Sequence, residues 1–458
     1  MRTGYPRAVS PRPPGPAIAL MLTASLGLGA LNAWNAARLF PHWAHDLAFF
    51  TQLVHRAAEG GPWSSPLLFE PEGFFEMVHT HLVLPIVVAT WWAVGRQEVL
   101  LVVQGLFAGL ALWPAWQLGE QTGGRRHAWA AMLACLAFGP FQAVATADFR
   151  PVALFIPGVL GLFAAAHRRD LLGVLVWACV ANLGRQEGAF LVCAAGAGLL
   201  LIPLDAPGEG SRLRRQWSGT RRREGLVALA TGGAWLAFWA WTKPTLFFHV
   251  SPSLDLGIQL APDIVQNRSA FAQKLGFSGA ALGLLSPAGL IAGLPVGLQM
   301  AVNPREWGAM TGPAAHYHAF WLPFVLASAI PGSARLGRLG GPLLIIGLAL
   351  PFGWAVPRTG PVDAAALEPR VHVTDRVAAD DFVIHRYAGR EVLWNTRQVE
   401  QPPHEKPRTW PQGAWPIPLD AVDVVVARLD DPLVALARAA RWTEEARSET
   451  HVVMRREP

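Results

Sequence analysis

Long apolar runs separated by short polar loops occupy most of the 458-residue chain. A bilayer core is crossed by about 20 apolar residues in helical form, so runs of this kind predict membrane-spanning helices. Ten runs fit this description, several of them shorter than a full span: 17–37, 98–118, 127–147, 152–166, 171–183, 188–204, 225–241, 277–300, 316–330 and 341–356. The pattern predicts a mainly α, polytopic membrane protein whose helical part covers residues 16–356.

Two segments need separate treatment before helices are counted. Residues 82–95 are apolar but short for a span, which is typical of an interfacial or re-entrant helix. The run 277–300 contains Pro287 and Pro295, and two tilted half-spans would explain both prolines. With 82–95 left out and 277–300 crossing once or twice, the sequence predicts about ten or eleven transmembrane helices.

The pattern changes after residue 356, where polar residues replace the apolar runs. Strands are expected at 371–373 and 422–426, and the second is apolar enough to be buried in a parallel sheet. The apolar spacing at 433–446 predicts an amphipathic helix, and 450–455 predicts a final strand. Residues 357–458 are therefore expected to form a small α/β domain.

Composition agrees with a membrane protein and argues against a single soluble globule of this size. Hydrophobic residues make up 52% of the chain and charged residues 15%, against about 25% charged residues in soluble domains. The three cysteines, Cys135, Cys179 and Cys193, lie inside apolar runs. We interpret them as buried thiols rather than as disulfide partners or metal ligands.

The basic character of the chain is a signal of topology. The net charge is +6, a value that can indicate nucleic-acid binding, but arginines gather in four short loops. Cytoplasmic loops are enriched in Arg and Lys, so these four loops are assigned to the cytoplasm together with the Pro/Arg-rich residues 1–15. The four groups are Arg125 and Arg126, residues 167–169, residues 212–223, and Arg335 with Arg338. No nucleic-acid partner is expected.

The same assignment orients the C-terminal domain. If 277–300 crosses the membrane twice, eleven crossings place residues 357–458 outside the cytoplasm. If 277–300 crosses once, the domain lies in the cytoplasm. We expect the first arrangement, with loop 40–81 also outside.

Loop 40–81 begins with an amphipathic helix, because residues 47, 50, 53 and 54 are apolar at helical spacing. Asp46 stands at its start. There it either caps the helix and complements its dipole, or serves as a general base or cation ligand at the membrane surface. His79 and His81 follow in the same loop, two residues apart, which is a weak metal-binding signal.

Three other outer segments carry charge where apolar residues are expected. Asp148 and Arg150 precede Pro151, and Asp148 is suited to cap the helix that follows. Arg150 opposes the dipole of that helix and so requires an anion, for which Asp148 and a lipid phosphate are both candidates. Arg185 and Glu187 interrupt an apolar run, either as a local ion pair or as a functional site. His316 and Tyr317 open a later span.

Taken in order, these landmarks resemble a known family. The stretch from His45 and Asp46 onward, His79 to His81, Gln104, Asp148 to Pro151, Arg185 to Glu187, and His316 with Tyr317 resemble domain-of-unknown-function family 2079, a family of bacterial membrane proteins. That family is in turn similar to the GT-C superfamily of integral-membrane glycosyltransferases. One departure is that members of the family tend to carry His where Arg150 stands, so this chain keeps a cationic side chain but loses a titratable base.

The resemblance implies a function at the outer face of the bacterial cytoplasmic membrane. The protein would be a glycosyltransferase whose donor is a polyprenyl-phosphate-linked sugar in the lipid bilayer, with an unassigned acceptor. Asp46 would be the catalytic general base, and Arg150 and Arg185 would face the donor phosphate. The residues implied in substrate binding are His45, His79, His81, Gln104, Asp148, Arg150, Arg185, Glu187, His316 and Tyr317.

Other functions and the metal requirement stay open at this point. The outer loops contain no clean Asp-x-Asp pair, so no metal ligand is assigned, although a divalent cation is compatible with the carboxylates. A transporter or lipid flippase would share the many helices, but it usually carries inverted repeats and charges well inside its spans. A non-catalytic membrane scaffold would leave Asp46, Arg150 and Arg185 far apart.

Overall fold

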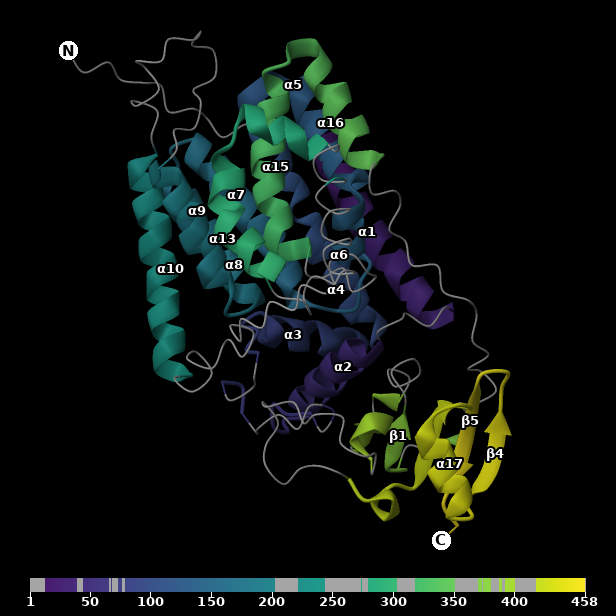
Figure 1. Cartoon of the computed structure of the whole chain (residues 1–458). Helices are drawn as coiled ribbons and strands as arrows, with labels where there is room; N and C mark the ends of the chain where they lie inside the picture. The colour runs from purple at the N-terminus through teal and green to yellow at the C-terminus, as the bar shows by residue number, and fades with distance from the viewer. Residues whose placement is uncertain are drawn as a thin grey trace, which may run out of the picture.

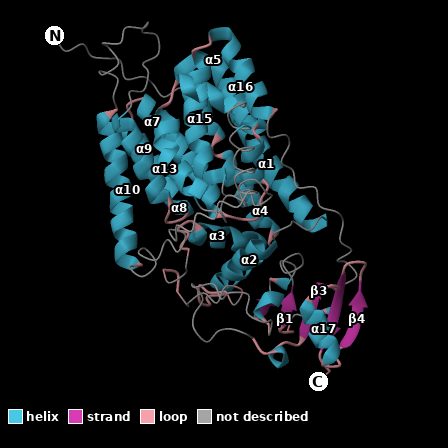
Figure 2. Ribbon diagram, in the orientation of Figure 1, coloured by secondary structure: helices cyan, strands magenta, loops and turns pink. Residues whose placement is uncertain are grey.

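The computed structural model describes residues 13–38, 44–65, 79–201, 221–243, 279–302, 318–350 and 417–457, with shorter stretches at 67, 73–75 and 273 and between 370 and 399. The described part is a bundle of apolar helices joined to a small sheet domain, as expected (Figure 1). The helices are cyan and the strands magenta in Figure 2.

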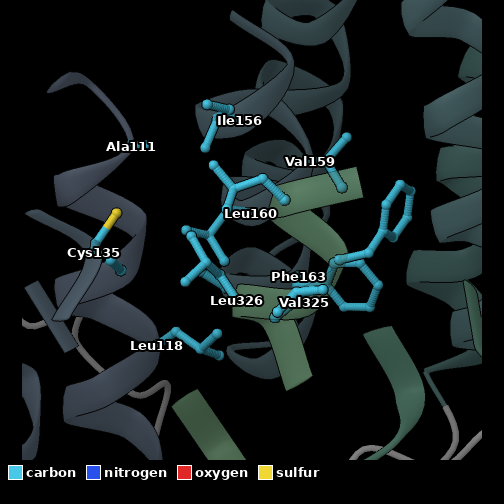
Figure 3. Packing of buried hydrophobic residues seen from close by; sticks show 14 of the residues in the cluster. Ala111, Leu118, Cys135, Ile156, Val159, Leu160, Phe163, Val325 and Leu326 are labelled. Carbon is cyan, nitrogen blue, oxygen red and sulfur yellow. The ribbon is translucent and has the colours of Figure 1, made fainter. Parts of the chain in front are cut away.

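Helix α7, Phe155–His167, lies at the centre of the helical body. Every residue from Phe155 to Ala166 is buried, and a helix that is apolar on all sides is stable only where neighbours surround it. Those neighbours include α5 (Leu112–Ala137) and α15 (His318–Ala334), whose side chains meet Ile156, Leu160 and Phe163 in Figure 3.

The apolar stretch Glu98–Ala137 passes through the helical body more than once. It contains α4, Glu98–Gly109, and α5, and α5 reverses direction at Gly124, whose φ of +78° interrupts the helix. The reversal brings its two arms into contact, because a Cβ at Gly119 would lie 2.8 Å from the Cα of Ala128. In one straight helix those residues would be about 13 Å apart. The turn lies beside Arg125 and Arg126, as the sequence predicts.

Helices α8 (Leu171–Gly184), α9 (Gly188–Leu201) and α10 (Arg222–Thr242) continue the bundle, and α1 (Gly15–Arg38) packs antiparallel on α4. By length and composition, three of the described helical stretches could cross a membrane: Gly15–Trp34, Glu98–Ala137 and Arg222–Thr242. The others are shorter apolar helices. The expected ten or eleven crossings stay a prediction.

The segment with two internal prolines is bent, as expected. A 3-10 helix, η4 (Gly279–Leu285), and α13 (Ala288–Val302) meet at a bend of 118° around Pro287. Such a bent pair is a broken span or a re-entrant loop. Beyond α15, α16 (Gly340–Ala349) packs against α5 and η4.

The basic groups gather at one end of the helical body. Arg168 donates to the Oε1 of Gln117 at 2.7 Å, and the Nε of Arg221 donates to the carbonyl of Ala166 at 2.9 Å. His127 contacts the carbonyl of Ile330 at 2.9 Å, shortly before the Arg335 group. The sequence assigned these groups to one side of the membrane, and the structure brings their described residues together.

The opposite end is covered by two short helices, α2 (Ala44–Ala58) and α3 (Leu84–Val94), which lie across the bundle in Figure 1. The predicted helix at this position is confirmed as α2, but its burial is not confined to one face: every residue from Leu47 to Val54 is buried, including the polar Thr51 and Gln52. Helix α3 is about 16 Å long at 1.5 Å per residue, too short to span, which agrees with the expectation for residues 82–95.

The C-terminal domain is a five-stranded sheet in the order β2-β1-β3-β5-β4, and it lies at the α2 end of the helical body (Figure 1). Strands β1 (Val377–Ala379), β2 (Leu393–Asn395) and β3 (Val424–Arg428) are parallel, whereas β4 (Thr443–Arg447) and β5 (His451–Arg455) are antiparallel. One face of the sheet packs with α17 (Pro432–Ala439), and the other belongs to the same hydrophobic cluster as α2 and α3.

Four expectations for this domain are tested by the structure. The buried parallel strand and the final strand are confirmed as β3 and β5. The first strand among the described residues is β1, which begins at Val377, and Val371 and His372 lie outside any strand, so the prediction at 371–373 is wrong. The expected helix at 433–446 is also wrong in length: α17 ends at Ala439, Arg441 adopts a φ of +64°, and β4 follows.

Candidate functional site

Asp46 and Arg150 meet at the α2 end of the helical body. Asp46 lies in the first turn of α2, and Arg150 lies between α6 (Gly139–Ala145) and the 3-10 helix η1 (Pro151–Leu154). The Nη2 of Arg150 forms an ion pair with the Oδ2 of Asp46, and both side chains are roughly three-quarters buried, at 21% and 25% exposure. The anion that Arg150 requires is therefore Asp46.

Asp148 was one of the anions expected beside Arg150, and it takes a different role. Its Oδ2 is buried and has no hydrogen-bond partner among the described residues. Burial raises the pKa of Asp148 to about 8, because a charged carboxylate is costly away from water. The expected helix cap is wrong as well, since Arg150 occupies the N-cap position of η1 and no side chain caps it.

Two buried amides fix the backbone on either side of Asp148. The Nδ2 of Asn32 on α1 donates to the carbonyl of Ala147 at 2.7 Å. The amide of Gln104 on α4 accepts from the backbone N–H of Arg150 at 3.0 Å and donates to the carbonyl of Val144 at 2.7 Å. Gln104, implied in substrate binding, thus uses its amide to hold the 144–150 segment. Asn32 was not singled out from the sequence.

A second ion pair lies in the tight loop between α8 and α9. The Nη2 of Arg185 contacts the Oε1 of Glu187, the local pair that the sequence left as one alternative. Polar atoms of this loop are still incompletely bonded: the Nε of Arg185 and the Oε2 of Glu187 are buried without a hydrogen-bond partner among the described residues. Such atoms are costly unless something completes them, so the pair retains capacity for a ligand.

The segment that contains His79 and His81 packs beside this second pair. The Nδ1 of His81 lies 2.6 Å from the carbonyl of Gly184, and because a carbonyl only accepts, Nδ1 carries the proton. Burial lowers the pKa of His81 to about 3, against a smaller raising effect of that hydrogen bond. His81 is thus neutral at pH 7. Gln186 bridges the loop by accepting from the N–H of Thr80 at 3.1 Å and contacting the Nδ1 of His79 at 3.2 Å.

Phe50 connects the two ion pairs. It stands one helical turn after Asp46, and its ring contacts the rings of Phe149 and His81, each at a centroid distance of 5.2 Å. The backbones also touch, because a Cβ at Gly184 would lie 2.8 Å from the carbonyl oxygen of Pro151. The loops carrying Arg150 and Arg185 are therefore neighbours.

Most of the predicted site residues are thus gathered at one end of the bundle, but three are not described in full. His45 lies in the first turn of α2, with a side chain outside the described part, and His316 and Tyr317 lie outside the described residues. Within the part of the chain that the structure describes, no group of three His, Cys, Asp or Glu side chains could hold a metal ion.

Comparison with known proteins agrees with the sequence analysis over the central part of the chain. Residues 39–255 match a family described as predicted membrane protein (DUF2079). The predicted resemblance is confirmed over this range, which contains α2 to α10 and both ion pairs. No curated protein matches the chain.

Among solved structures, the chain is similar to the oligosaccharyltransferase of Archaeoglobus fulgidus. The complex with zinc and sulfate gives a TM-score of 0.42 at 14% identity, covering 90% of this chain and 68% of that one. The apo form has the same TM-score at 12% identity, covering 83% and 65%. The form tethered to an acceptor peptide with the NVT sequon also gives 0.42, at 13% identity, covering 90% and 69%. A likeness of this degree decides neither the activity nor the site.

Proposed function

We propose that the protein is a membrane glycosyltransferase that takes a sugar from a polyprenyl-phosphate-linked donor at the outer face of the cytoplasmic membrane. The observation that carries the proposal is the Asp46–Arg150 pair, formed by the first turn of α2 and the segment before η1 at the end of the bundle opposite the basic clusters. A carboxylate beside a guanidinium supplies the two groups that glycosyl transfer from a phosphate needs: a proton acceptor and a phosphate ligand.

The mechanism begins with an exchange of anions. In the resting site the carboxylate of Asp46 is engaged by Arg150, and an engaged carboxylate is a weak base. The donor phosphate competes for the guanidinium, which binds phosphate in a planar, bidentate manner. Arg150 then turns toward the phosphate and frees Asp46, so that the base is available only when the donor is bound.

Transfer follows as a single displacement. The acceptor hydroxyl oxygen forms a bond to the anomeric carbon as the bond from that carbon to the phosphate oxygen breaks, which inverts the configuration. Asp46 takes the hydroxyl proton, and the lipid phosphate leaves with the electron pair of the broken bond. Fixed cations at Arg150 and Arg185 stabilise the charge that develops on the leaving phosphate. The acceptor and the sugar are left unassigned.

The test is transfer of a radiolabelled sugar from a polyprenyl-phosphate donor by the purified protein in nanodiscs. Asp46→Asn is expected to lower the rate by about 100-fold or more, as loss of a general base does, without lowering lipid binding. Asp430→Asn, which removes an exposed carboxylate in the C-terminal domain, is the matched control. Undiminished transfer by a folded Asp46→Asn protein would refute the base assignment, and movement of the intact lipid without transfer would favour a flippase.

A further inference from the structure

A run of aromatic rings connects α10 with the segment that precedes His79. Trp63 contacts Phe74 at a centroid distance of 4.9 Å. Phe74 contacts Phe75 at 5.1 Å, and Phe75 contacts Phe238 of α10 at 6.2 Å. Each pair meets edge to face, which is a favourable arrangement of aromatic rings. We call these four residues the aromatic run, and it joins the loop after α2 to the end of a helix far along the chain.

The α10 end of the aromatic run lies on a surface suited to lipid. Helix α10 is long and apolar enough to cross a membrane, and it stands at the edge of the bundle in Figure 1. Its exposed apolar side chains include Leu226 and, at the same end as Phe238, Trp241. Phe238 is half-buried between the exposed Ala237 and the buried Trp239, so it borders the surface that we expect lipid chains to contact.

The loop part of the aromatic run is tied to the second ion pair by hydrogen bonds. The carbonyl of Phe74 accepts from the Oγ1 of Thr80 at 3.4 Å, and the N–H of Thr80 donates to the Oε1 of Gln186 at 3.1 Å. Gln186 stands between Arg185 and Glu187, which form the pair. The aromatic run thus extends from the expected lipid surface to the loop that holds the Arg185 guanidinium.

Phe75 leaves nearly half of its surface exposed. It contacts the rings of Phe74 and Phe238, yet 46% of the residue is exposed. A phenylalanine that only fastened its loop to α10 would be more stable with this apolar surface covered. Anchoring at the membrane surface is the alternative role for an exposed aromatic ring, but Trp241, at 80% exposure, already occupies the outward position at this end of α10. The exposed ring of Phe75 is therefore available to an apolar ligand.

We propose that the aromatic run binds the isoprenoid chain of the donor lipid, with Phe75 as its central contact. The inference rests on the proposed function, because the chain would belong to the polyprenyl-phosphate donor. A ligand that lies along the run must be apolar beside the rings and anionic where the run meets the Arg185 loop, and a lipid phosphate has both parts. Contact with aromatic rings stabilises an apolar chain, and a guanidinium is a phosphate ligand.

A chain bound in this way would also direct its phosphate toward the first ion pair. The loops that carry Arg185 and Arg150 are neighbours, because a Cβ at Gly184 would lie 2.8 Å from the carbonyl oxygen of Pro151. The aromatic run would then select the lipid that carries the sugar, whereas the ion pairs would perform the transfer.

The test compares two lipids that share a phosphate headgroup and differ in their apolar chains. Polyprenyl monophosphate and phosphatidic acid compete for the protein in detergent micelles, and native mass spectrometry gives the ratio of their affinities. The wild type is expected to prefer the polyprenyl lipid. Phe75→Ala removes the exposed ring and is expected to lower that ratio about tenfold, as loss of an aromatic contact does. Phe75→Tyr keeps the ring and should retain the preference.

A matched variant separates lipid recognition from membrane anchoring. Trp241→Ala removes a more exposed ring from the same end of α10, and it is expected to keep the affinity ratio within about twofold of the wild type. Phe238→Leu keeps α10 apolar and should lower the ratio, so the outcome does not depend on the folding of Phe75→Ala alone. An unchanged ratio in Phe75→Ala, an equal loss in Trp241→Ala, or a wild type that binds phosphatidic acid as tightly as polyprenyl monophosphate would overturn the proposal.

The two proposals fail in distinguishable ways, because the binding experiment needs no catalysis. A lipid preference that depends on Phe75 in a protein without transfer activity would contradict the proposed function and retain the lipid site. Transfer from a polyprenyl-phosphate donor by a protein whose lipid preference is unaffected by Phe75→Ala would contradict the lipid site and retain the function.

Discussion

At the scale of single residues, the candidate site consists of two ion pairs, Asp46 with Arg150 and Arg185 with Glu187, and of the buried carboxyl group of Asp148. Asp46, Asp148, Arg150, Arg185 and Glu187 stood out because charges are rare in an apolar chain. Which carboxylate faces Arg150 depends on where α2 lies, and no local pattern carries that information. Asn32 was missed for the same reason, since its hydrogen bond to the carbonyl of Ala147 appears only when α1 packs beside that segment.

Asp148 gives a pH dependence that can be measured at this scale. Its pKa is raised by burial to about 8, from an ordinary value of 3.8. Between about pH 4 and pH 8 the unfolded state loses this proton while the native state keeps it. The native state then binds more protons, so this group lowers stability as the pH rises through that window.

Asp148→Asn cannot ionise and is expected to flatten the profile. The measurement is the apparent melting temperature of the detergent-solubilised protein from pH 5 to pH 8, where the wild type should lose stability relative to the variant as the pH rises. His81 and the other titrating groups are common to both proteins and cancel in the difference. Parallel profiles would show that Asp148 is ionised in the native protein.

At the scale of secondary-structure elements, the hydrophobic pattern correctly predicted those elements that are buried on all sides. The central helix α7 and strand β3 are buried on all sides, so their apolar runs are unambiguous. The prediction failed at 433–446, because residues after α17 also carry a helix-compatible pattern. Arg441 ends the helix in the left-handed region, and Trp442 is then buried. Pairing of β4 with β5 decides the structure there, and such pairing is not local.

The prediction at this scale concerns the contact between the end of α8 and the start of η1. Gly184→Ala would place a Cβ 2.8 Å from the carbonyl oxygen of Pro151. The backbone at Pro151 cannot move aside without cost, so we expect the free energy of unfolding to fall by about 1–3 kcal/mol, which is typical of overpacking. We also expect glycosyl transfer to be lost as the two loops separate.

Gly233→Ala on α10 is the matched control, because its Cβ would meet nothing within 4 Å. Alanine inside a helix is favoured over glycine by about 0.5–1 kcal/mol, so this variant should be as stable as the wild type or more so. Thermal unfolding and the transfer assay check both variants. The close approach of the loops is contradicted if Gly184→Ala behaves like Gly233→Ala.

At the scale of the whole molecule, the distribution of arginines predicted an arrangement that the structure bears out in part. The described basic groups lie at one end of the helical body, and α2, both ion pairs and the C-terminal domain lie at the other (Figure 1). A bilayer orients short basic loops toward the cytoplasm. We therefore expect the membrane to separate the two ends, with the sheet domain on the same side as the candidate site.

This orientation is tested by labelling single introduced cysteines. Glu449→Cys lies on an exposed residue of the sheet domain, and Leu336→Cys lies on an exposed residue between the basic Arg335 and Arg338. In intact cells, a membrane-impermeant maleimide should label the first and not the second, and lysis should make both reactive. The native cysteines are buried or partly buried, so the wild type gives the background. Labelling of Leu336→Cys in intact cells would reverse the orientation and would move the Asp46–Arg150 pair to the cytoplasmic face, where a donor at the outer face cannot reach it.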